Sequence, residues 1–368
     1  MRERRQIVQL WQQGKAVALV TLVKVIGSSY RQPGARLLLN AGGEYAGTIS
    51  GGCLETEVIR KAVWMMRNGA VVERYSTMFD DTAEIPFGLG CGGEVDLLIE
   101  PVDTAECKAL MAALAASLAG EEATVVTWLP GDGKKLRRAI LSAAGEVIFA
   151  SEALGEKKLA CAHGLQAGTE YEGRFVEELC APQRLFVLGA GDDAKPLVSM
   201  SALLGWSVTV ADARRQMAKA ERFPDAERVS VSTDVHELGV SSSDAVVLMT
   251  HSYEQDREAL AALLPIAPRY LGLLGARHRS ALLINEAAAL MGLPIEQCCE
   301  RVHAPVGFDL GGDGPEAVAL AVIAEAQACC MGKTGVSRKL TAENVAEQIA
   351  LGGASRYLRT HCATDVPQ

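Results

Sequence analysis

The sequence predicts a two-domain α/β protein. An N-terminal α/β module with glycine-rich loops precedes a C-terminal Rossmann-type domain with a parallel sheet. The chain has 368 residues, which exceeds the length that one ordinary hydrophobic core serves. From residue 184 onward, short apolar strands alternate with amphipathic helices, as in βαβ units. A glycine fingerprint follows the first of these strands. Length, alternation and fingerprint together predict this fold class.

The domain boundary is expected close to residue 180, because a proline there stops strand pairing just before a new strand begins. Within the N-terminal domain, the first hundred residues form the better defined core. The predicted parts are residues 1–180, with core 1–100 and a weaker segment 101–180, then residues 181–332, and a tail of residues 333–368.

Composition excludes several classes of protein. With 49% hydrophobic and 22% charged residues, the chain has the make-up of a globular protein. A net charge of −9 argues against broad nucleic-acid binding, which needs a basic surface. No stretch approaches the roughly 18 apolar residues of a membrane helix, and the start does not resemble a secretory signal. We therefore expect a cytoplasmic protein with mostly reduced cysteines, none of which stands in a CxxC pair.

The fingerprint consists of Gly189, Gly191 and Ala194, between an apolar strand and an amphipathic helix. In this motif the first glycine permits a tight turn, and the second lets backbone amides approach a pyrophosphate. An alanine at the third position still permits close packing of helix and strand. The phosphates of a ligand would lie at the helix N-terminus, where free N–H groups and the helix dipole favour anions.

Asp212 ends the next predicted strand, about 20 residues after the second glycine, where an acidic residue binds the ribose 2′-hydroxyl in this fold. Arg214 and Arg215 follow it, and either would suit a 2′-phosphate. The choice between NAD and NADP therefore stays open.

Other residues at this edge of the sheet have competing interpretations. Asp192 and Asp193 oppose a bound pyrophosphate, so a purely structural, empty glycine loop is the alternative. His251 follows a buried strand and either contacts the ligand or caps the next helix. We interpret residues 277–279 as a solvated helix start, with contact to phosphate oxygens as the alternative. Asp309 is expected to line a cleft between the domains.

An earlier glycine loop contains Ser50, Gly51, Gly52 and Cys53, where a strand is expected to end and a helix to begin. Its amides would form a second anion site, and the helix dipole would stabilise a thiolate on Cys53. Cys91 lies in another glycine-rich loop that would let a ligand come close. The alternative for both cysteines is ordinary packing.

These motifs resemble those of the XdhC/CoxI family of xanthine dehydrogenase accessory proteins. The N-terminal module of that family is resembled by residues 27–40, 47–58 and 88–101. Its C-terminal Rossmann module is resembled by residues 184–197, 208–214, 250–251, 270–280 and 303–328. The motifs occur in the order of the family and lie at both ends of the chain.

The resemblance implies a function that the motifs alone do not supply. Proteins of the family serve molybdenum hydroxylases: they bind the molybdenum cofactor, support its sulfuration and pass it to the apo-enzyme. It thus implies molybdopterin, in its mononucleotide or dinucleotide form, as the cofactor. It also implies an apo molybdenum hydroxylase and a cysteine desulfurase, or another sulfur donor, as partners. A thiolate suits molybdenum, and Cys53 is the candidate contact. We further expect a homo-oligomer.

We therefore interpret the chain as a cofactor chaperone rather than an enzyme with turnover, whose two domains share one ligand in the cleft between them. An NAD(P)-dependent oxidoreductase is the first alternative, because the fingerprint ordinarily suggests one. A nucleotide-regulated adaptor is the second.

Overall fold

The computed structural model describes residues 1–27, 29–52, 54–76, 93–131, 133–152, 154–168 and 171–350. The chain forms two compact units, which we describe separately. Within the described ranges, the N-terminal unit comprises residues 3–181 and 339–350, and the Rossmann unit comprises residues 182–338 with residues 1–2. No helix in the described ranges is long and apolar enough to cross a membrane.

The first sheet of the N-terminal unit has five antiparallel strands in the order β3-β2-β1-β5-β4. They are β1 (Ala16–Ile26), β2 (Arg36–Asn40), β3 (Tyr45–Gly47), β4 (Val71–Ser76) and β5 (Glu94–Pro101). β1 is central because its apolar run can be buried on both faces. The strand expected to reach residue 50 ends at Gly47, which has a φ of +86°. A Cβ there would lie 2.2 Å from the carbonyl oxygen of Arg36, so only glycine fits.

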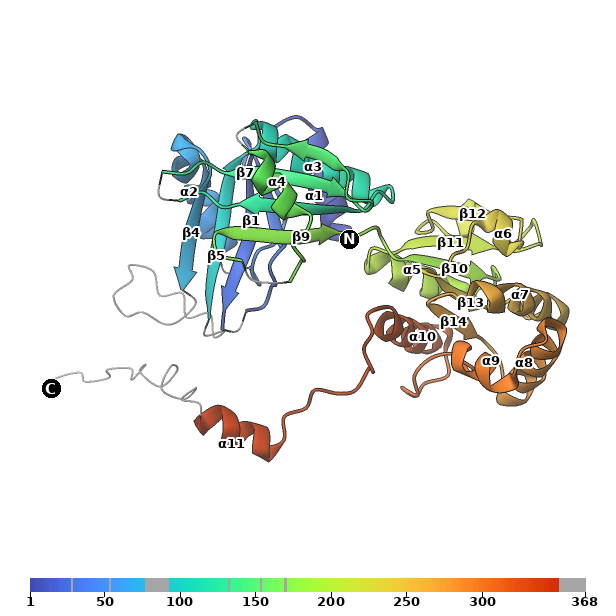
Figure 1. Cartoon of the computed structure of the whole chain (residues 1–368). Helices are drawn as coiled ribbons and strands as arrows, with labels where there is room; N and C mark the ends of the chain where they lie inside the picture. Colours follow the sequence, from blue (N-terminus) through green and yellow to red (C-terminus); the bar gives the residue numbers. More distant parts are fainter. Residues whose placement is uncertain are drawn as a thin grey trace. The chain divides into compact units, whose positions relative to one another are not determined.

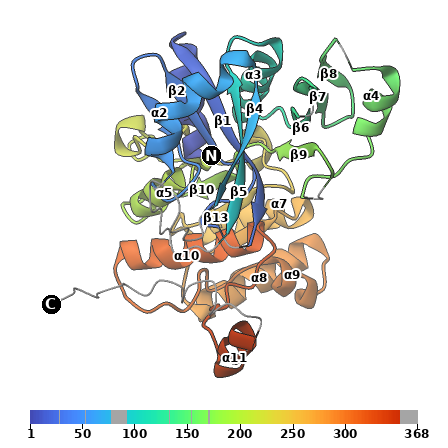
Figure 2. The same ribbon diagram turned by 90° about the vertical axis from the view of Figure 1, so that its left-hand side faces the viewer.

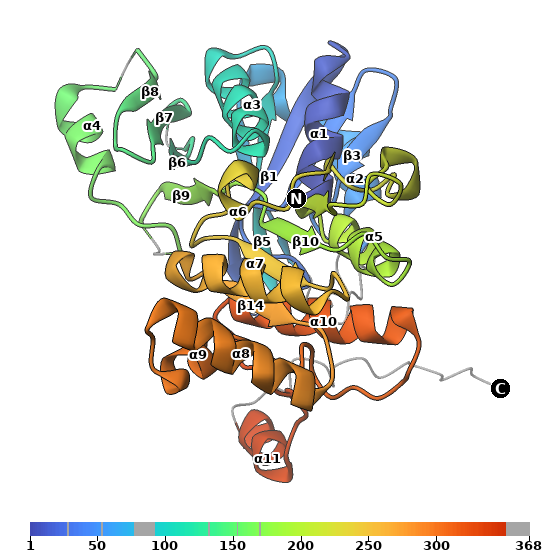
Figure 3. The same cartoon turned by 90° about the vertical axis from the view of Figure 1, so that its right-hand side faces the viewer.

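The second sheet is a four-stranded antiparallel one in the order β8-β7-β6-β9. Its strands are β6 (Ala123–Trp128), β7 (Arg137–Ser142), β8 (Val147–Ala150) and β9 (Arg174–Leu179). The helices are α1 (Arg2–Gln12), α2 (Glu55–Met65), α3 (Ala105–Leu118), α4 (Glu156–Ala162) and α11 (Ala342–Ala350). α1 and α3 share one hydrophobic cluster with strands of both sheets, and α3 lies between the second sheet and α1 (Figure 3). α2 covers the other face of the first sheet (Figure 2). α4 packs on the outer face of the second sheet.

A buried ion pair joins the two sheets. Arg138 of β7 donates two hydrogen bonds to the carboxylate of Glu100 on β5, of 2.9 and 3.0 Å. Both side chains are 1% exposed. The guanidinium also donates to the hydroxyl of Thr127 and to the carbonyl of Glu106 at the start of α3. Burial lowers the pKa of Arg138, but the adjacent Glu100 raises it by more, so the pKa of the guanidinium lies above its ordinary value.

The sheet of the Rossmann unit is entirely parallel, in the order β12-β11-β10-β13-β14, which confirms the predicted fold class. Its strands are β10 (Arg184–Leu188), β11 (Ser207–Ala211), β12 (Arg228–Ser230), β13 (Ala245–Leu248) and β14 (Tyr270–Leu273). The chain winds outward first through β11 and β12 and then through β13 and β14. The direction therefore reverses between β10 and β13, and ligands of such sheets bind at the carboxyl ends of the strands beside this point.

Helices cover both faces of this sheet (Figure 1). They are α5 (Ala194–Leu203), α6 (Val235–Leu238), α7 (Tyr253–Ile266), α8 (Arg277–Met291), α9 (Ile295–Arg301) and α10 (Pro315–Cys330). Successive β10 side chains alternate between the faces, as strand geometry requires. Leu185 and Val187 pack toward α5 and α10, whereas Phe186 and Leu188 pack toward α7 and α8.

Candidate functional site

The glycine turn after β10 packs directly on the neighbouring strand. Gly189 has a φ of +124°, and a Cβ there would lie 2.2 Å from the carbonyl oxygen of Met249, just after β13. Its N–H donates to the carbonyl of Ala211 at 2.8 Å. The turn thus lies at the point where the winding of the sheet reverses.

Asp212 ties this turn to the end of β11. One carboxylate oxygen accepts from the N–H of Ala190 and from the Arg214 guanidinium, at 2.8 and 2.7 Å. The other accepts from the backbone N–H and Nε of Arg214, at 2.8 and 2.9 Å. These four bonds fill the acceptor positions of a carboxylate. Asp212 is 3% exposed.

The bonds of Asp212 have a chemical consequence. Burial raises its pKa, but the Arg214 guanidinium and the backbone donors outweigh burial, and the pKa lies below the ordinary value. A ribose hydroxyl would have to take the place of an Arg214 donor to bond this carboxylate. The ribose assignment of Asp212 stays a prediction, and so does a phosphate role for Arg215.

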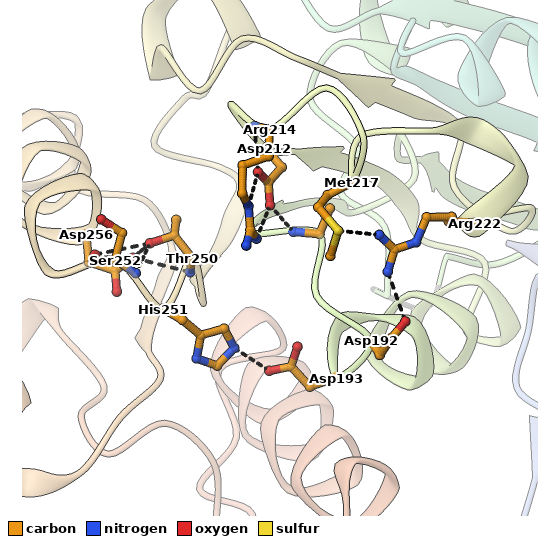
Figure 4. Close-up of polar contacts among 11 residues, drawn as sticks. Asp192, Asp193, Asp212, Arg214, Met217, Arg222, Thr250, His251, Ser252 and Asp256 are labelled. Carbon is orange, nitrogen blue, oxygen red and sulfur yellow. Dashed lines mark hydrogen bonds and ion pairs between the residues drawn. The ribbon is translucent and has the colours of Figure 1, made fainter.

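The two carboxylates of the loop point in different directions (Figure 4). Asp192 is exposed and pairs with Lys195 at 2.7 Å and with Arg222 at 2.9 Å. The hydrogen bonds from Lys195 and Arg222 hold the pKa of Asp192 below its usual range. Asp192 is therefore neutralised by neighbouring cations and does not lie over the glycine turn.

Asp193 instead lies over the turn. A Cβ on Gly191 would lie 2.2 Å from Oδ1 of Asp193, so this oxygen occupies the space directly above Gly191. Oδ2 of Asp193 lies 2.8 Å from Nε2 of His251 (Figure 4). Asp193 precedes α5 but makes no side-chain capping bond to it.

His251 is held in an uncommon backbone conformation. Its φ is +62°, in the left-handed region that non-glycine residues rarely adopt. The Thr250 hydroxyl fixes the turn: it accepts from the N–H of Ser252 and donates to the carboxylate of Asp256 at 2.7 Å. Ser252, rather than His251, caps α7. The side chain of His251 is thus exposed at the carboxyl edge of the sheet and directed at Asp193 (Figure 4).

Sequence reasoning missed the residue behind this turn. Asp256 is fully buried and accepts from Arg279 of α8 at 2.7 Å. The interpretation of residues 277–279 as a solvated helix start is therefore wrong for Arg279, because its guanidinium neutralises a buried carboxylate. Acidic residues are common in first turns of helices, so the sequence carried no signal for this pair.

A cavity of about 200 Å³ lies beside the glycine turn. Its walls come from α5, the ends of β13 and β14, and the start of α10, and they are formed by Asp193, Leu197, Val247, Met249, Leu274, Asp313, Pro315, Val318, Ala319 and Val322. The sequence did not indicate it, because these residues are far apart along the chain. Asp309 is exposed in the loop before α10 and does not line this cavity, so its role stays a prediction.

In the N-terminal unit, the loop that contains Gly51 is organised by the buried Glu55. Its carboxylate accepts from the N–H groups of Ile49 and Ser50, at 3.0 and 2.8 Å, and from the Ser50 hydroxyl. The same hydroxyl accepts from the N–H of Gly52. Burial raises the pKa of Glu55, but these donors lower it by a larger amount, so the pKa lies below the ordinary value. Several loop amides are thus engaged within the loop.

The predicted anion site at Ser50, Gly51 and Gly52 stays a prediction. Cys53 and Cys91 lie outside the described residues. Among the residues that the structure describes, no group of three or more His, Cys, Asp or Glu side chains could hold a metal ion.

The strand order, the glycine turn at the point of reversal and the acid after β11 define a Rossmann domain. Comparison with known proteins identifies a family within this class of Rossmann proteins. A family model described as the XdhC Rossmann domain matches residues 185–326, and one described as the XdhC and CoxI family matches residues 10–76.

Similar proteins extend over both units. A Bacillus subtilis protein, named as a probable subunit of xanthine dehydrogenase, is 26% identical over 323 residues, which is 83% of this chain and 91% of that protein. The Escherichia coli protein named molybdenum cofactor insertion chaperone PaoD is 26% identical over 326 residues, 87% of this chain and 86% of that protein.

A crystal structure described as a xanthine dehydrogenase from Bacillus halodurans is 26% identical, with a TM-score of 0.77. The similarity covers 93% of this chain and 99% of the crystallised one. The chain belongs to the XdhC and CoxI family, which confirms the resemblance seen in the sequence.

The two fingerprint glycines should respond differently to alanine. Gly189→Ala should lower the free energy of unfolding by roughly 2–5 kcal/mol, because its Cβ meets backbone atoms at a positive φ. Gly191→Ala should have a small effect, since its Cβ meets only the movable end of Asp193. Calorimetry of both full-length variants tests this. Equal losses would contradict the described turn.

Asp212→Asn should lower the free energy of unfolding by about 1–3 kcal/mol at pH 7. A depressed pKa means that the carboxylate contributes stability above its ordinary pKa of about 3.9, and that this contribution is lost as the pH falls through the lower native pKa. The gap in melting temperature between wild type and variant should therefore close below about pH 4.

Melting curves between pH 7 and pH 3 measure the gap, with Asp192→Asn, an exposed carboxylate of the glycine turn, as the matched control. The control should melt close to wild type, since exposed pairs contribute little. A gap for Asp212→Asn that is independent of pH would show that its charge does not hold the turn.

Proposed function

We propose that this chain is a molybdenum cofactor chaperone that binds the cofactor and delivers it to an apo molybdenum hydroxylase of the xanthine dehydrogenase type. The supporting observation is the alignment with PaoD, a protein named for molybdenum cofactor insertion, over 87% of this chain. Both units take part in this alignment, so the proposal concerns the whole chain. The similarity to a protein named for xanthine dehydrogenase supports the class of client.

The carboxyl edge of the Rossmann sheet has the chemistry that such a ligand needs. The cofactor is a pterin that carries a phosphate and, when bound, a molybdenum centre. We assign the phosphate to the space above Gly191, where α5 begins and its dipole favours anions. In the described conformation Asp193 occupies this space, so the ligand would displace its carboxylate and meet His251. Asp309 is proposed to contact the ligand from the loop before α10.

The finer steps are also part of the proposal. The glycine loop of Ser50–Cys53, and Cys91, would approach the molybdenum end of the cofactor, with the thiol of Cys53 as its contact. A cysteine desulfurase or another sulfur donor would supply the sulfur of the mature cofactor. Thiolate ligands suit a soft metal centre.

An NAD(P)-dependent oxidoreductase is less well supported. Dinucleotide binding in this fold uses an acid that is available to the ribose, and all four acceptor positions of Asp212 are engaged. The nucleotide-regulated adaptor would also use the glycine turn, to bind its nucleotide, but the name of PaoD favours cofactor insertion over an adaptor role.

Wild-type protein purified from cells that make the molybdenum cofactor should carry pterin in near-stoichiometric amount. Gly191→Val should stay folded but carry much less, because its branched side chain blocks the approach of phosphate. The assay denatures the protein and measures the fluorescence of the released pterin. Absence of pterin, together with bound nicotinamide and substrate-linked reduction, would favour the oxidoreductase.

Cys53→Ser should retain the fold and bind pterin, but fail to protect or transfer the sulfurated cofactor. The test loads wild type and variant with cofactor, adds each to an apo-hydroxylase under the same reducing conditions, and measures the recovered activity. Bound molybdenum and pterin, determined before transfer, give a readout that is independent of the client. Equal activation by both proteins would show that Cys53 is an ordinary packing residue without a role in cofactor transfer.

A further inference from the structure

The cavity between α5 and α10 has the size of a single ring system. Its volume is about 200 Å³. Sites that enclose a whole drug-sized ligand measure about 300–1,000 Å³. A complete dinucleotide therefore does not fit, whereas one bicyclic base does.

The walls of the cavity are mainly aliphatic and come from well-packed elements. Leu197 of α5 and Val322 of α10 are each 2% exposed, and Met249 is 4% exposed. Val318 lies on the side of α10 that is partly open to solvent, at 36% exposed. Side chains of this kind form a preformed apolar slot, which suits the faces of a flat aromatic ring.

Two carboxylates supply the polar groups of the cavity, and they differ in their partners. Asp193 contacts His251. Asp313 is exposed, and no hydrogen bond or ion pair joins it to any residue that the structure describes. Its loop contains Gly311 and Gly312, both at positive φ, directly before α10. An ionised carboxylate only accepts hydrogen bonds, so it selects a ring that presents donors.

A carboxylate binds two parallel N–H donors best, in the two-pronged geometry that it also forms with arginine. A 2-amino-4-oxopyrimidine edge offers this pair, because its ring N–H stands beside its amino group. The edge occurs in pterin and in guanine. In adenine and cytosine the amino group stands beside a bare ring nitrogen, which would repel the carboxylate.

We propose that this cavity is a ring-binding subsite for a 2-amino-4-oxopyrimidine edge, which is read by Asp313 and enclosed by the aliphatic walls from α5, β13 and α10. The inference rests on the proposed function, in which pterin is the source of the edge. Guanine of a nucleotide is the other source of the same chemistry.

The subsite adjoins the phosphate position. Asp193 lines the cavity and also lies above Gly191, so the two positions share this side chain. A ligand that carries both a ring and a phosphate would occupy the cavity and the glycine turn together. This arrangement separates recognition of the ring, by Asp313, from recognition of the phosphate, by the backbone.

The test titrates the full-length protein with 6-hydroxymethylpterin, which has neither phosphate nor metal, and follows quenching of its fluorescence. Asp313→Asn should weaken binding by at least about tenfold, because it removes a charged acceptor. Val318→Phe should weaken binding by a similar factor, because it fills the cavity. The matched controls are Glu316→Gln, an exposed carboxylate in the first turn of α10, and Leu320→Phe, an exposed position outside the cavity. Both controls should bind like wild type.

Competition identifies the source of the edge. GMP, AMP and CMP carry the same phosphate and differ in the base, so displacement of the pterin by GMP alone is expected. Of pterin and GMP, the ligand that binds with the lower dissociation constant is the source of the 2-amino-4-oxopyrimidine edge. Displacement by AMP or CMP as strong as by GMP would overturn the inference. So would binding to Asp313→Asn within twofold of wild type, or failure of wild type to bind the pterin.

These outcomes are distinct from failure of the proposed function. If the cofactor copurifies with the wild type but free 6-hydroxymethylpterin does not bind, the chaperone proposal stands. Only the proposed subsite is then wrong.

Discussion

The carboxyl edge of the Rossmann sheet depends on the buried carboxylate of Asp212. It joins the turn after β10, through the N–H of Ala190, to the segment after β11, through Arg214. A buried charge without partners is expensive, so the four bonds form a set in which no donor is dispensable. The consequence is a glycine turn whose position is fixed before any ligand arrives.

The proposed anion site at the glycine turn has to be reconciled with the acidic character of the chain. The net charge is −9, and carboxylates surround the site. Asp192 is neutralised by Lys195 and Arg222, and the buried Asp256 by Arg279. Asp193 differs, because its partner is His251, which adopts a left-handed backbone conformation. The carboxylate nearest the glycine turn is therefore paired with a histidine rather than with a lysine or an arginine.

Much of the architecture followed from short-range patterns in the sequence. Apolar strands that alternate with amphipathic helices predicted the parallel sheet, and the fingerprint placed the turn of Gly189 and Gly191 at its edge. The family was also recognisable, because its motifs are contiguous and keep their order. These features depend on local propensity and spacing, which one sequence displays.

The features that the sequence did not predict depend on contacts between residues that are far apart in the chain. Asp192 and Asp193 are adjacent in the chain and looked equivalent, yet one turns to Arg222 and the other to His251, 30 and 58 residues away. Asp212 was expected to be available to a ribose, but its bonds with Arg214 depend on a rotamer that spacing does not specify. The cavity beside the turn needed α10 to be placed against α5, which no local pattern encodes.

The Arg138–Glu100 pair restricts how the N-terminal unit can change over evolution. Either residue alone would leave an uncompensated charge at the junction of the two sheets, which is far more damaging than loss of the pair as a whole. Replacement therefore has to pass through a strongly destabilised intermediate or occur at both positions together. Homologous chains should accordingly keep both residues or have exchanged both for apolar ones, and this covariation marks the junction even where the surrounding sequence has diverged.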